Sequence, residues 1–560
     1  MRKGDMLRLF ILLFVIPLLL CPLLSCRGGA PSVEGMLDSI DPEGIRAHLR
    51  FLSDDLLEGR GTGQRGGDIA AQYIATQFAL AGLKPPLEGG SYLQPVPLVG
   101  VTTDPSSSFS IRRGQRRLPM RYLDDYVLWT ELQQKRASVK GELVFVGYGI
   151  IAPEYQWDDY KGVDLKDKIL VMLVNDPPSE DPNLFGGRAL TYYGRWTYKY
   201  EIAAKVGAKG AILIHTTESA GYGWNVVRNS WGREQTFVGL DEKSPRTLAL
   251  GSWVSEATGR ELLKLAGHDF DQLREAAAGR DFRPIPLGLT AEAEITSKVR
   301  NISTANVIGV VEGTDLKDKL VVYTAHYDHL GIAEPVKGDR IYNGAMDNAS
   351  GVATIIEIAR ALANTPLKPR RTVMFISTAC EEGGLRGSQY YAEHPLYPPG
   401  KTAGNINLDV ISVLGRTEDF CFMGAERGTL WPVAERVAQE MGITLVPDPN
   451  PGQGSYYRSD HFPLARMGIP AVSLKPGTTY EGHPPEWGVQ QREDYQRNHY
   501  HQPSDEYDPS WDLSGGVQIG KVALLFGWYI ANMDEMPTWN PGDEFAQIRE
   551  ESLKKVTGVK

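Results

Sequence analysis

The chain of 560 residues contains only four cysteines, and their places exclude a fold that depends on many disulfides. Cys21 and Cys26 lie near the start of the chain, whereas Cys380 and Cys421 lie far downstream. A single bridge between the last two would suit an oxidising compartment, but its geometry does not follow from the sequence. The sequence therefore predicts no disulfide framework.

The sequence also lacks a block of positive charge. Its formal net charge is -10, from 59 lysines and arginines against 69 aspartates and glutamates. Nucleic acid has no electrostatic reason to bind such a chain, because lysine and arginine supply most of the affinity for phosphate. No internal repeat is present, and the 60 glycines and 36 prolines are spread among periodic segments. With 42% hydrophobic residues, the composition indicates a soluble globular protein with room for more than one core.

The apolar run at the start of the chain is too short and too interrupted for a membrane span. Arg2, Lys3 and Arg8 precede LFILLFVIPLLLCPLLS, which contains two prolines. A spanning helix needs about 20 apolar residues, so an export signal over residues 1–25 is the better interpretation. The sequence LLSC, ending at Cys26, resembles the bacterial lipobox, in which the cysteine is lipidated and becomes the mature N-terminus.

This segment predicts an exported protein. With a lipid on Cys26, the protein would be a lipoprotein of the bacterial cell envelope, on the periplasmic side or at the surface, and the lipid would be its only membrane attachment. Short cleavage motifs also arise by chance, and a plain secretory signal would give a secreted protein. Residues 26–40 then read as a linker.

The rest of the chain divides into segments of different pattern. Residues 41–135 include the helical periodicity of DIAAQYIATQFALAG, and we expect them to form the N-terminal part of the main domain. Residues 136–295 run through short β-rich pieces such as GELVFVGYG and KILVMLVND, and such a segment can fold on its own. We interpret it as an inserted domain. Residues 296–535 would complete the main domain, and residues 536–560 would form a C-terminal tail.

Strands and helices alternate in the segment from residue 296. Apolar runs such as KLVVYTAH and RRTVMFIST alternate with amphipathic helices such as GVATIIEIARALAN. This pattern predicts an α/β fold with a mostly parallel mixed sheet that is covered by helices on both faces. In such folds, functional residues gather at the carboxyl ends of the strands.

Several polar residues are expected to terminate these apolar strands. They are His326 and Asp328 in AHYDH, Asp347 in NGAMDNASG, Glu381 and Glu382 in ACEEGG, Asp409 in NINLD, and His501 in YHQPSDEYD. Each one alone is better explained as a helix cap or a hydrogen-bonded structural residue. Together, imidazoles and carboxylates form the ligand set that zinc or a similar ion prefers. Their number suits two ions that share a carboxylate, and the positive charge of the ions would make two adjacent glutamates tolerable.

Six motifs in this order resemble the co-catalytic zinc aminopeptidases of peptidase clan MH. The motifs are AHYDH, NGAMDNASGVA, ACEEGGLRGS, NLD, YRSDHFPLARMGIPAV and YHQPSDEYDP. LSDDLLEGRGTG resembles the N-terminal segment of that family, and the insertion resembles its protease-associated domain. The resemblance implies the zinc exopeptidase fold and an enzyme that hydrolyses N-terminal residues from peptides.

The resemblance also implies a role for each residue of the motifs. Five residues would bind two zinc ions: His326 and Asp409 one ion, Glu382 and His501 the other, with Asp347 as the bridge between them. The adjacent Glu381 would be the general base that takes a proton from water and returns it to the leaving amine.

Residues outside the ligand set receive supporting roles from the same resemblance. Asp328 would fix the imidazole of the first zinc-binding histidine, and Asp505 would either do the same for His501 or cap a loop. Tyr500 would stabilise the oxyanion, and Arg458 would lie near the substrate. Three further histidines, which exceed the ligand count, would be supporting or structural: His329, His461 and His499.

Three alternatives stay open at this point. The clan also contains carboxypeptidases and single-zinc glutaminyl cyclases, although the full set of five ligands disfavours a cyclase. A receptor-like binding protein would have lost ligands or the base, and none is missing here.

Cys380 precedes the predicted base, but a cysteine nucleophile needs a histidine base and no adjacent carboxylates. We therefore interpret Cys380 as a packing residue. For the inserted domain we expect scaffolding or gating.

Overall fold

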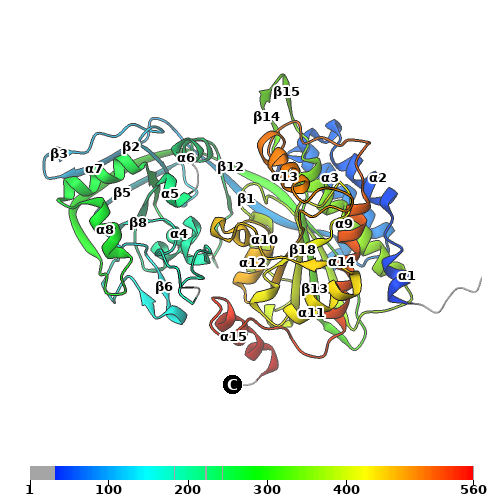
Figure 1. The fold of residues 1–560 in the computed structure, drawn as a ribbon. Coiled ribbons are helices and arrows are strands. Elements are labelled where there is room, and N and C mark those ends of the chain that lie inside the picture. Colours follow the sequence, from blue (N-terminus) through cyan, green and yellow to red (C-terminus); the bar gives the residue numbers. More distant parts are fainter. Residues whose placement is uncertain (1–31, 182, 221–222, 243, 559–560) are drawn as a thin grey trace, which may run out of the picture.

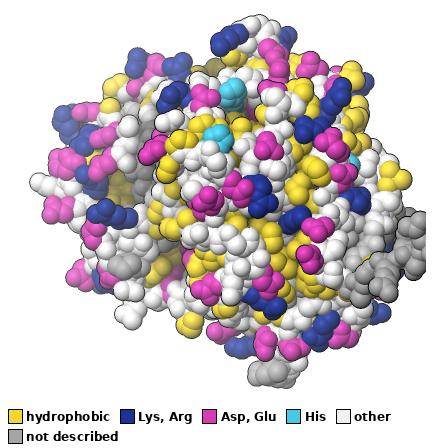
Figure 2. Space-filling view, turned by 45° about the vertical axis from the view of Figure 1, so that its right-hand side comes forward, with side chains coloured by type: hydrophobic (Ala, Val, Ile, Leu, Met, Phe, Trp, Pro, Cys, Tyr) yellow, Lys and Arg dark blue, Asp and Glu magenta, His cyan; other side chains and the backbone are white. Residues whose placement is uncertain are grey.

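The computed structural model describes residues 32–558, except for residues 182, 221–222 and 243. The predicted signal, with Cys26, lies outside the described residues. Within the described part of the chain, no helix is long and apolar enough to cross a membrane. Figure 2 shows side chains of both charges interspersed on the face that it presents.

The main lobe is built on a mixed, mostly parallel part of a 16-stranded sheet. β13 pairs in parallel with β16 and β17, β17 with β20, and β18 with β19. β12 pairs antiparallel to β16, and β18 pairs antiparallel to β20. In spatial order the strands are β19 (Thr444–Leu445), β18 (Asp419–Met423), β20 (Ala471–Pro476), β17 (Thr402–Leu408), β13 (Leu316–His326), β16 (Arg371–Thr378) and β12 (Ile285–Val311). The prediction of an α/β fold with this type of sheet is confirmed.

Helices cover both faces of this sheet, as Figure 1 shows. Tyr323 and Phe375 belong to the core under the larger group of helices, and their neighbours Val322 and Met374 belong to a smaller core on the opposite face. The first group comprises α2 (Pro42–Leu52), α3 (Arg65–Leu80), α9 (Ser350–Asn364), α11 (Trp431–Met441) and α14 (Ser514–Asn532). The opposite face is covered by α10 (Arg386–Glu393) and α12 (His461–Arg466). The alternation along the strands explains why their sequences are apolar throughout.

A second lobe has its own hydrophobic core, which extends from Phe109 to Ile295. Its strands are β2 (Ser108–Arg113), β4 (Tyr126–Trp129), β5 (Arg136–Phe145), β8 (Ile169–Leu173), β9 (Gly210–Ile214) and β11 (Leu250–Val254). Its principal helices are α4 (Trp196–Lys205), α6 (Trp224–Trp231), α7 (Glu256–Ala266) and α8 (Phe270–Ala277). The long strand β12 runs through both lobes, and β1 (Leu93–Thr103) pairs with its second half (Figure 1).

The second core begins earlier in the chain than the sequence-based boundary at residue 136. β2 pairs with β12 and β4 pairs with β11, so residues 108–129 pack with the second lobe and not with the main one. These pairings join segments that are far apart in sequence, and local patterns do not reveal them. The identity of this lobe as a protease-associated domain stays a prediction.

The C-terminal segment, expected to be a tail, is packed against the main lobe. Trp539 and Phe545 are buried in a cluster with Tyr456, and α15 (Ala546–Thr557) follows. Arg427 forms ion pairs of 2.8 Å with Asp543 and 2.7 Å with Glu544. Aromatic burial and these ion pairs therefore fix the segment to the fold.

Candidate metal centre

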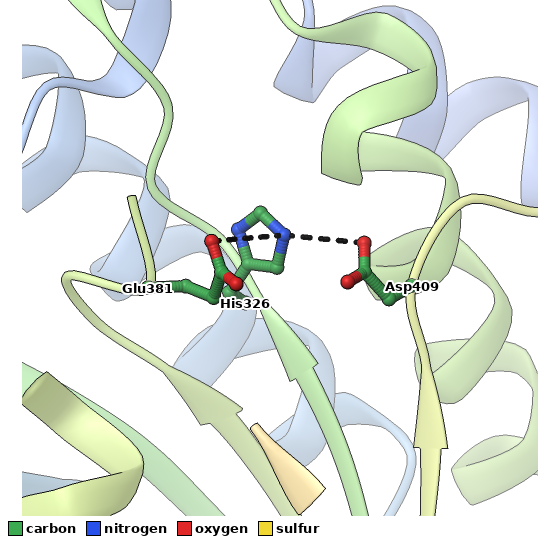
Figure 3. A group of neighbouring side chains, drawn as sticks. All are labelled: His326, Glu381 and Asp409. Atoms are coloured by element: carbon green, nitrogen blue, oxygen red, sulfur yellow. Dashed lines mark ion pairs between the residues drawn. The ribbon is translucent and has the colours of Figure 1, made fainter. Parts of the chain in front are cut away.

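The parallel strands bring three of the predicted residues to one edge of the sheet. β13 ends at His326, β16 ends three residues before Glu381, and β17 ends immediately before Asp409. The imidazole Nε2 of His326 lies 3.4 Å from Asp409 Oδ1 and 4.0 Å from Glu381 Oε2. Figure 3 shows the histidine ring between the two carboxylates, each of which comes from a different segment.

Asp347 lies between two histidines at the N-terminal side of α9. Its Oδ1 is 3.3 Å from His326 Nε2, and its Oδ2 is 3.4 Å from His501 Nε2. His501 Nε2 is also 3.1 Å from Glu382 Oε2. The two oxygens of one buried carboxylate thus face two separate groups of polar side chains, as a bridging ligand requires.

The unsatisfied atoms of the site fit bound cations. Nε2 of both His326 and His501 and Oε1 of Glu382 are buried but make no hydrogen bond of acceptable geometry. Such groups are costly to bury, unless an ion coordinates them. Two groups of residues could each hold an ion, because the ligand atoms within each group lie within 4.8 Å of one another. The first group is His326, Glu381 and Asp409, and the second is His329, Asp347 and Glu382. These donor sets, of imidazole and carboxylate, suit zinc.

Proton affinities in the site reflect the crowding of carboxylates. Burial alone would lower the pKa of His326, but the carboxylates around it, Glu381 first, outweigh this and hold the pKa well above its usual range. Burial raises the pKa of Glu381 well above the ordinary value, with His326 opposing. For Glu382, the histidines His501 and His329 outweigh burial and the repulsion from Asp347, and the pKa falls to about 2. The negative charge of the site therefore requires positive charge, which bound metal ions would supply in place of protons.

The carboxylate of Asp328, which the resemblance implied would fix the imidazole of His326, forms its hydrogen bonds with other residues. Its carboxylate Oδ1 accepts a 3.0 Å hydrogen bond from the backbone N–H of Glu381, and Oδ2 accepts one of 3.1 Å from the hydroxyl of Thr62. His326 Nδ1 lies 3.2 Å from the backbone carbonyl of Asp328 but 3.9 Å from its carboxylate. The residue therefore orients the imidazole through its backbone and the turn of Glu381 through its side chain.

The structure places Tyr500, Arg458 and Asp505 less directly at the site. The ring of Tyr500 stacks on that of His501 with centroids 3.9 Å apart, and the side chain is 45% exposed. Arg458 is exposed. Its backbone N–H donates a 3.2 Å hydrogen bond to the carbonyl of Ser455, but its guanidinium forms no hydrogen bond or ion pair with any described residue. Asp505 accepts hydrogen bonds from the backbone N–H groups of Met346 and Asp347, so it stabilises a turn and not the imidazole of His501.

Two further residues contact the predicted ligands: Ser459, which the sequence did not indicate, and His329, for which a supporting or structural role was expected. Ser459 donates a 2.7 Å hydrogen bond to Asp409 Oδ2 and accepts one of 2.8 Å from Asn407. His329 Nδ1 lies 2.7 Å from Glu382 Oε1. Both residues lie inside the motifs quoted above: Ser459 follows Arg458 in YRSDH, and His329 stands three residues after His326 in AHYDH.

The turn that carries the two glutamates also contacts the second lobe. Nε of Arg386, in EEGGLRGS, donates a 2.7 Å hydrogen bond to the carbonyl of Thr236 in β10 (Gln235–Val238). Cys380, at the start of this turn, is a buried free cysteine, as is Cys421. Burial raises the pKa of both thiols, that of Cys421 to about 12, so neither is disposed to act as a nucleophile.

Comparisons with known proteins identify a peptidase family model that matches the segment carrying this site. Residues 306–525 match the model described as Peptidase family M28, and this range contains all five predicted ligands. Aminopeptidase YwaD of Bacillus subtilis is 27% identical over 228 residues, which cover 39% of this chain and 44% of that protein. A probable zinc metalloprotease of Pyrenophora tritici-repentis is 34% identical over 300 residues, which cover 45% of this chain and 64% of that protein.

A solved structure, the aminopeptidase from Aneurinibacillus sp. strain AM-1, aligns with 91% of this chain and 99% of its own, at 19% identity and a TM-score of 0.48. The chain spans less than two thirds of the length of both curated relatives described above. The chain is therefore similar over part of its length to an aminopeptidase and to a probable zinc metalloprotease, and the match to the family model lies in the segment that carries the candidate metal centre.

Proposed function

We propose that the protein is a metal-dependent aminopeptidase that removes N-terminal residues from peptides with the help of two zinc ions. The position of Asp347 carries this proposal, because its two oxygens lie 3.3 and 3.4 Å from the Nε2 atoms of His326 and His501. One carboxylate between two ligand groups is what a pair of ions requires. The match of residues 306–525 to the peptidase family supports the same activity.

The residues divide between the two ions as follows. His326 and Asp409 would hold one ion, Glu382 and His501 would hold the other, and Asp347 would be shared. When bound, such ions act as Lewis acids on the substrate carbonyl and make water a stronger acid. His329, at 2.7 Å from Glu382, would hold the orientation of that ligand.

Glu381 would move the proton. Its backbone is fixed, because its N–H donates to Asp328 and its carbonyl accepts hydrogen bonds of 2.8 Å from Gly384 and Leu385. Burial raises the pKa of Glu381, which suits a group that takes a proton from water and then gives it to the leaving amine. Consecutive side chains point in different directions, so Glu381 faces His326 while Glu382 faces His329 and His501.

The same geometry allows a second role for Glu381, because it also lies within ligand distance in the first group. The variant Glu381→Gln separates the two roles, with Glu393→Gln on the exposed side of α10 as the matched control. If Glu381 is the base, Glu381→Gln should turn over substrate at least ~100-fold more slowly than the wild type but still bind about two zinc ions per chain. If Glu381 is a ligand, the variant should lose one of the two ions. Unchanged turnover in the variant would exclude both roles.

The assay uses a panel of aminoacyl reporters, the same reporters with a blocked amine, and C-terminal reporters, each with and without chelator. We expect hydrolysis of free N-termini alone, and its loss with chelator. Cleavage of C-terminal reporters would instead indicate a carboxypeptidase. Cyclisation of N-terminal glutamine, with a single tightly bound zinc, would indicate a glutaminyl cyclase.

We also propose that the protein is exported and carries a lipid on Cys26, as the lipobox-like LLSC indicates. Metabolic labelling with a fatty acid tests this directly. The full-length chain should incorporate the label and Cys26→Ser should not. Equal labelling of the two would refute the assignment.

A further inference from the structure

Arg60 is a completely buried arginine beside the candidate metal centre, at the end of the short helix η1 (Asp55–Arg60). Its guanidinium donates hydrogen bonds to backbone carbonyls alone: 2.7 Å to Tyr327, 2.5 Å to Asn343 and 2.8 Å to Gly344, and a further one to Leu52. No carboxylate among the described residues forms an ion pair with it.

Three of these carbonyls, those of Tyr327, Asn343 and Gly344, belong to the two segments that carry the predicted ligands His326 and Asp347, whereas Leu52 ends α2. Tyr327 stands between His326 and Asp328, and Gly344 begins the turn that contains Asp347. A single planar side chain therefore joins the end of β13 to the turn before α9. The distance of 3.3 Å between His326 Nε2 and Asp347 Oδ1 depends on how these two segments are spaced.

The residues after Arg60 extend the same contact. Gly61 forms a bridge with His329, and Thr62 donates a hydrogen bond to the carboxylate of Asp328. The backbone N–H of His329 donates to the carbonyl of Arg60 at 3.3 Å. The segment GRGTG thus lies along the loop that carries the first ligand, and its guanidinium reaches across to the second loop.

Only arginine meets the requirements of this position. Its planar fork offers five donors in fixed directions, whereas lysine offers three from a single point. Burial lowers the pKa of Arg60 to about 10, with the carboxylates of Asp505, Asp328 and Asp347 opposing, so the group stays charged near neutral pH. The charge is therefore present beside the ligands although no carboxylate touches it.

We propose that Arg60 is a positioning residue for the metal centre: by fixing the spacing of the loops that carry His326 and Asp347, it sets the affinity for the bound ions. This inference rests on the proposed two-zinc site. The charge of Arg60 and its hydrogen bonds to the loops should have opposite effects on zinc affinity. Removing a buried cation should strengthen the binding of Zn²⁺ if only charge mattered, whereas loss of the hydrogen bonds should weaken it.

The experiment measures zinc affinity by competition with a chromophoric chelator for the wild type, Arg60→Met and Arg60→Lys. The matched control is Arg371→Met, since Arg371 is also fully buried and donates to the carbonyls of Ile530 (2.7 Å), Met533 (2.6 Å) and Glu535 (2.9 Å) at the opposite end of β16. Thermal unfolding without metal gives the stability of each variant independently.

We expect Arg60→Met to bind zinc at least ~10-fold more weakly, with Arg60→Lys between it and the wild type. Arg371→Met should unfold at a lower temperature but bind zinc as the wild type does. The absorption spectrum of bound Co²⁺ should change in Arg60→Lys and not in the control. If Arg60→Met fails to fold, the zinc affinity and the Co²⁺ spectrum of Arg60→Lys test the inference instead.

Wild-type or higher zinc affinity in the Arg60 variants would overturn the inference while leaving the two-zinc site intact. Equal loss of zinc affinity in Arg371→Met would also overturn it, because the effect would then follow from lower stability. A wild-type protein that binds no zinc would instead refute the proposed function itself.

Discussion

Replacing Ser459 with alanine should weaken zinc binding at the side of the site formed by Asp409. The hydroxyl donates a 2.7 Å hydrogen bond to Oδ2 of this carboxylate, whose other oxygen faces His326. A hydrogen bond to a charged group contributes about 1.5–3 kcal/mol, which corresponds to a loss of roughly 10- to 100-fold in affinity. The side chain of Asp409 is 16% exposed, so water can replace part of the contact, and we expect the lower half of this range.

The assay is the same chelator competition, with Ser388→Ala as the control. Ser388 is also buried and donates a 2.6 Å hydrogen bond to a buried carboxylate, that of Asp460, which is not a predicted ligand. Ser459→Ala should lose affinity for one of the two ions, and Ser388→Ala should retain both affinities. Zinc binding in Ser459→Ala equal to that of the wild type would refute the view that this hydroxyl orients a ligand.

Two further predictions concern groups away from the ligands. Burial would raise the pKa of Glu357, but hydrogen bonds from His48 and from Arg360 outweigh the effect of burial and lower the pKa to about 2. Because this value lies below that of the unfolded chain, the carboxylate stabilises the fold above about pH 4.5 and loses this effect as the pH falls toward 2. In urea unfolding, Glu357→Gln should be less stable at pH 7 by roughly 2–3 kcal/mol and the difference should shrink with acid; a difference independent of pH would contradict the assignment. Iodoacetamide at pH 8 should leave Cys380 and Cys421 unmodified in the folded protein and label both in urea, whereas rapid labelling of the folded protein would show that one of them is accessible.

The sequence predicted the members of the site better than their contacts. His326, Glu381 and Asp409 could be grouped from sequence, because parallel strands end at one edge of a sheet. Asp347 and His501 were grouped with them as residues at strand ends, but Asp347 lies in the turn before α9 and His501 follows α13 (Trp487–Asn498), so neither ends a strand. The contact of Ser459 depends on where its loop meets the end of β17, which no local pattern encodes.

The fold, like the site, was predictable where it depends on local sequence patterns and not where it depends on contacts between distant segments. Apolar runs and helical periodicity sufficed for the α/β class, since each is a local property. The extent of the second lobe was not visible, because β4 pairs with β11 across more than a hundred residues of chain. Arg60 could not be recognised either, since its four partners are carbonyls, which any residue can supply.

The central claim is most directly tested by adding zinc in steps to the metal-free protein and measuring the hydrolysis of an aminoacyl reporter at each step. A shared carboxylate between two ligand groups predicts that full activity requires about two zinc ions per chain. Activity that reaches its maximum at one ion, or that persists in the metal-free protein, would contradict a two-ion aminopeptidase.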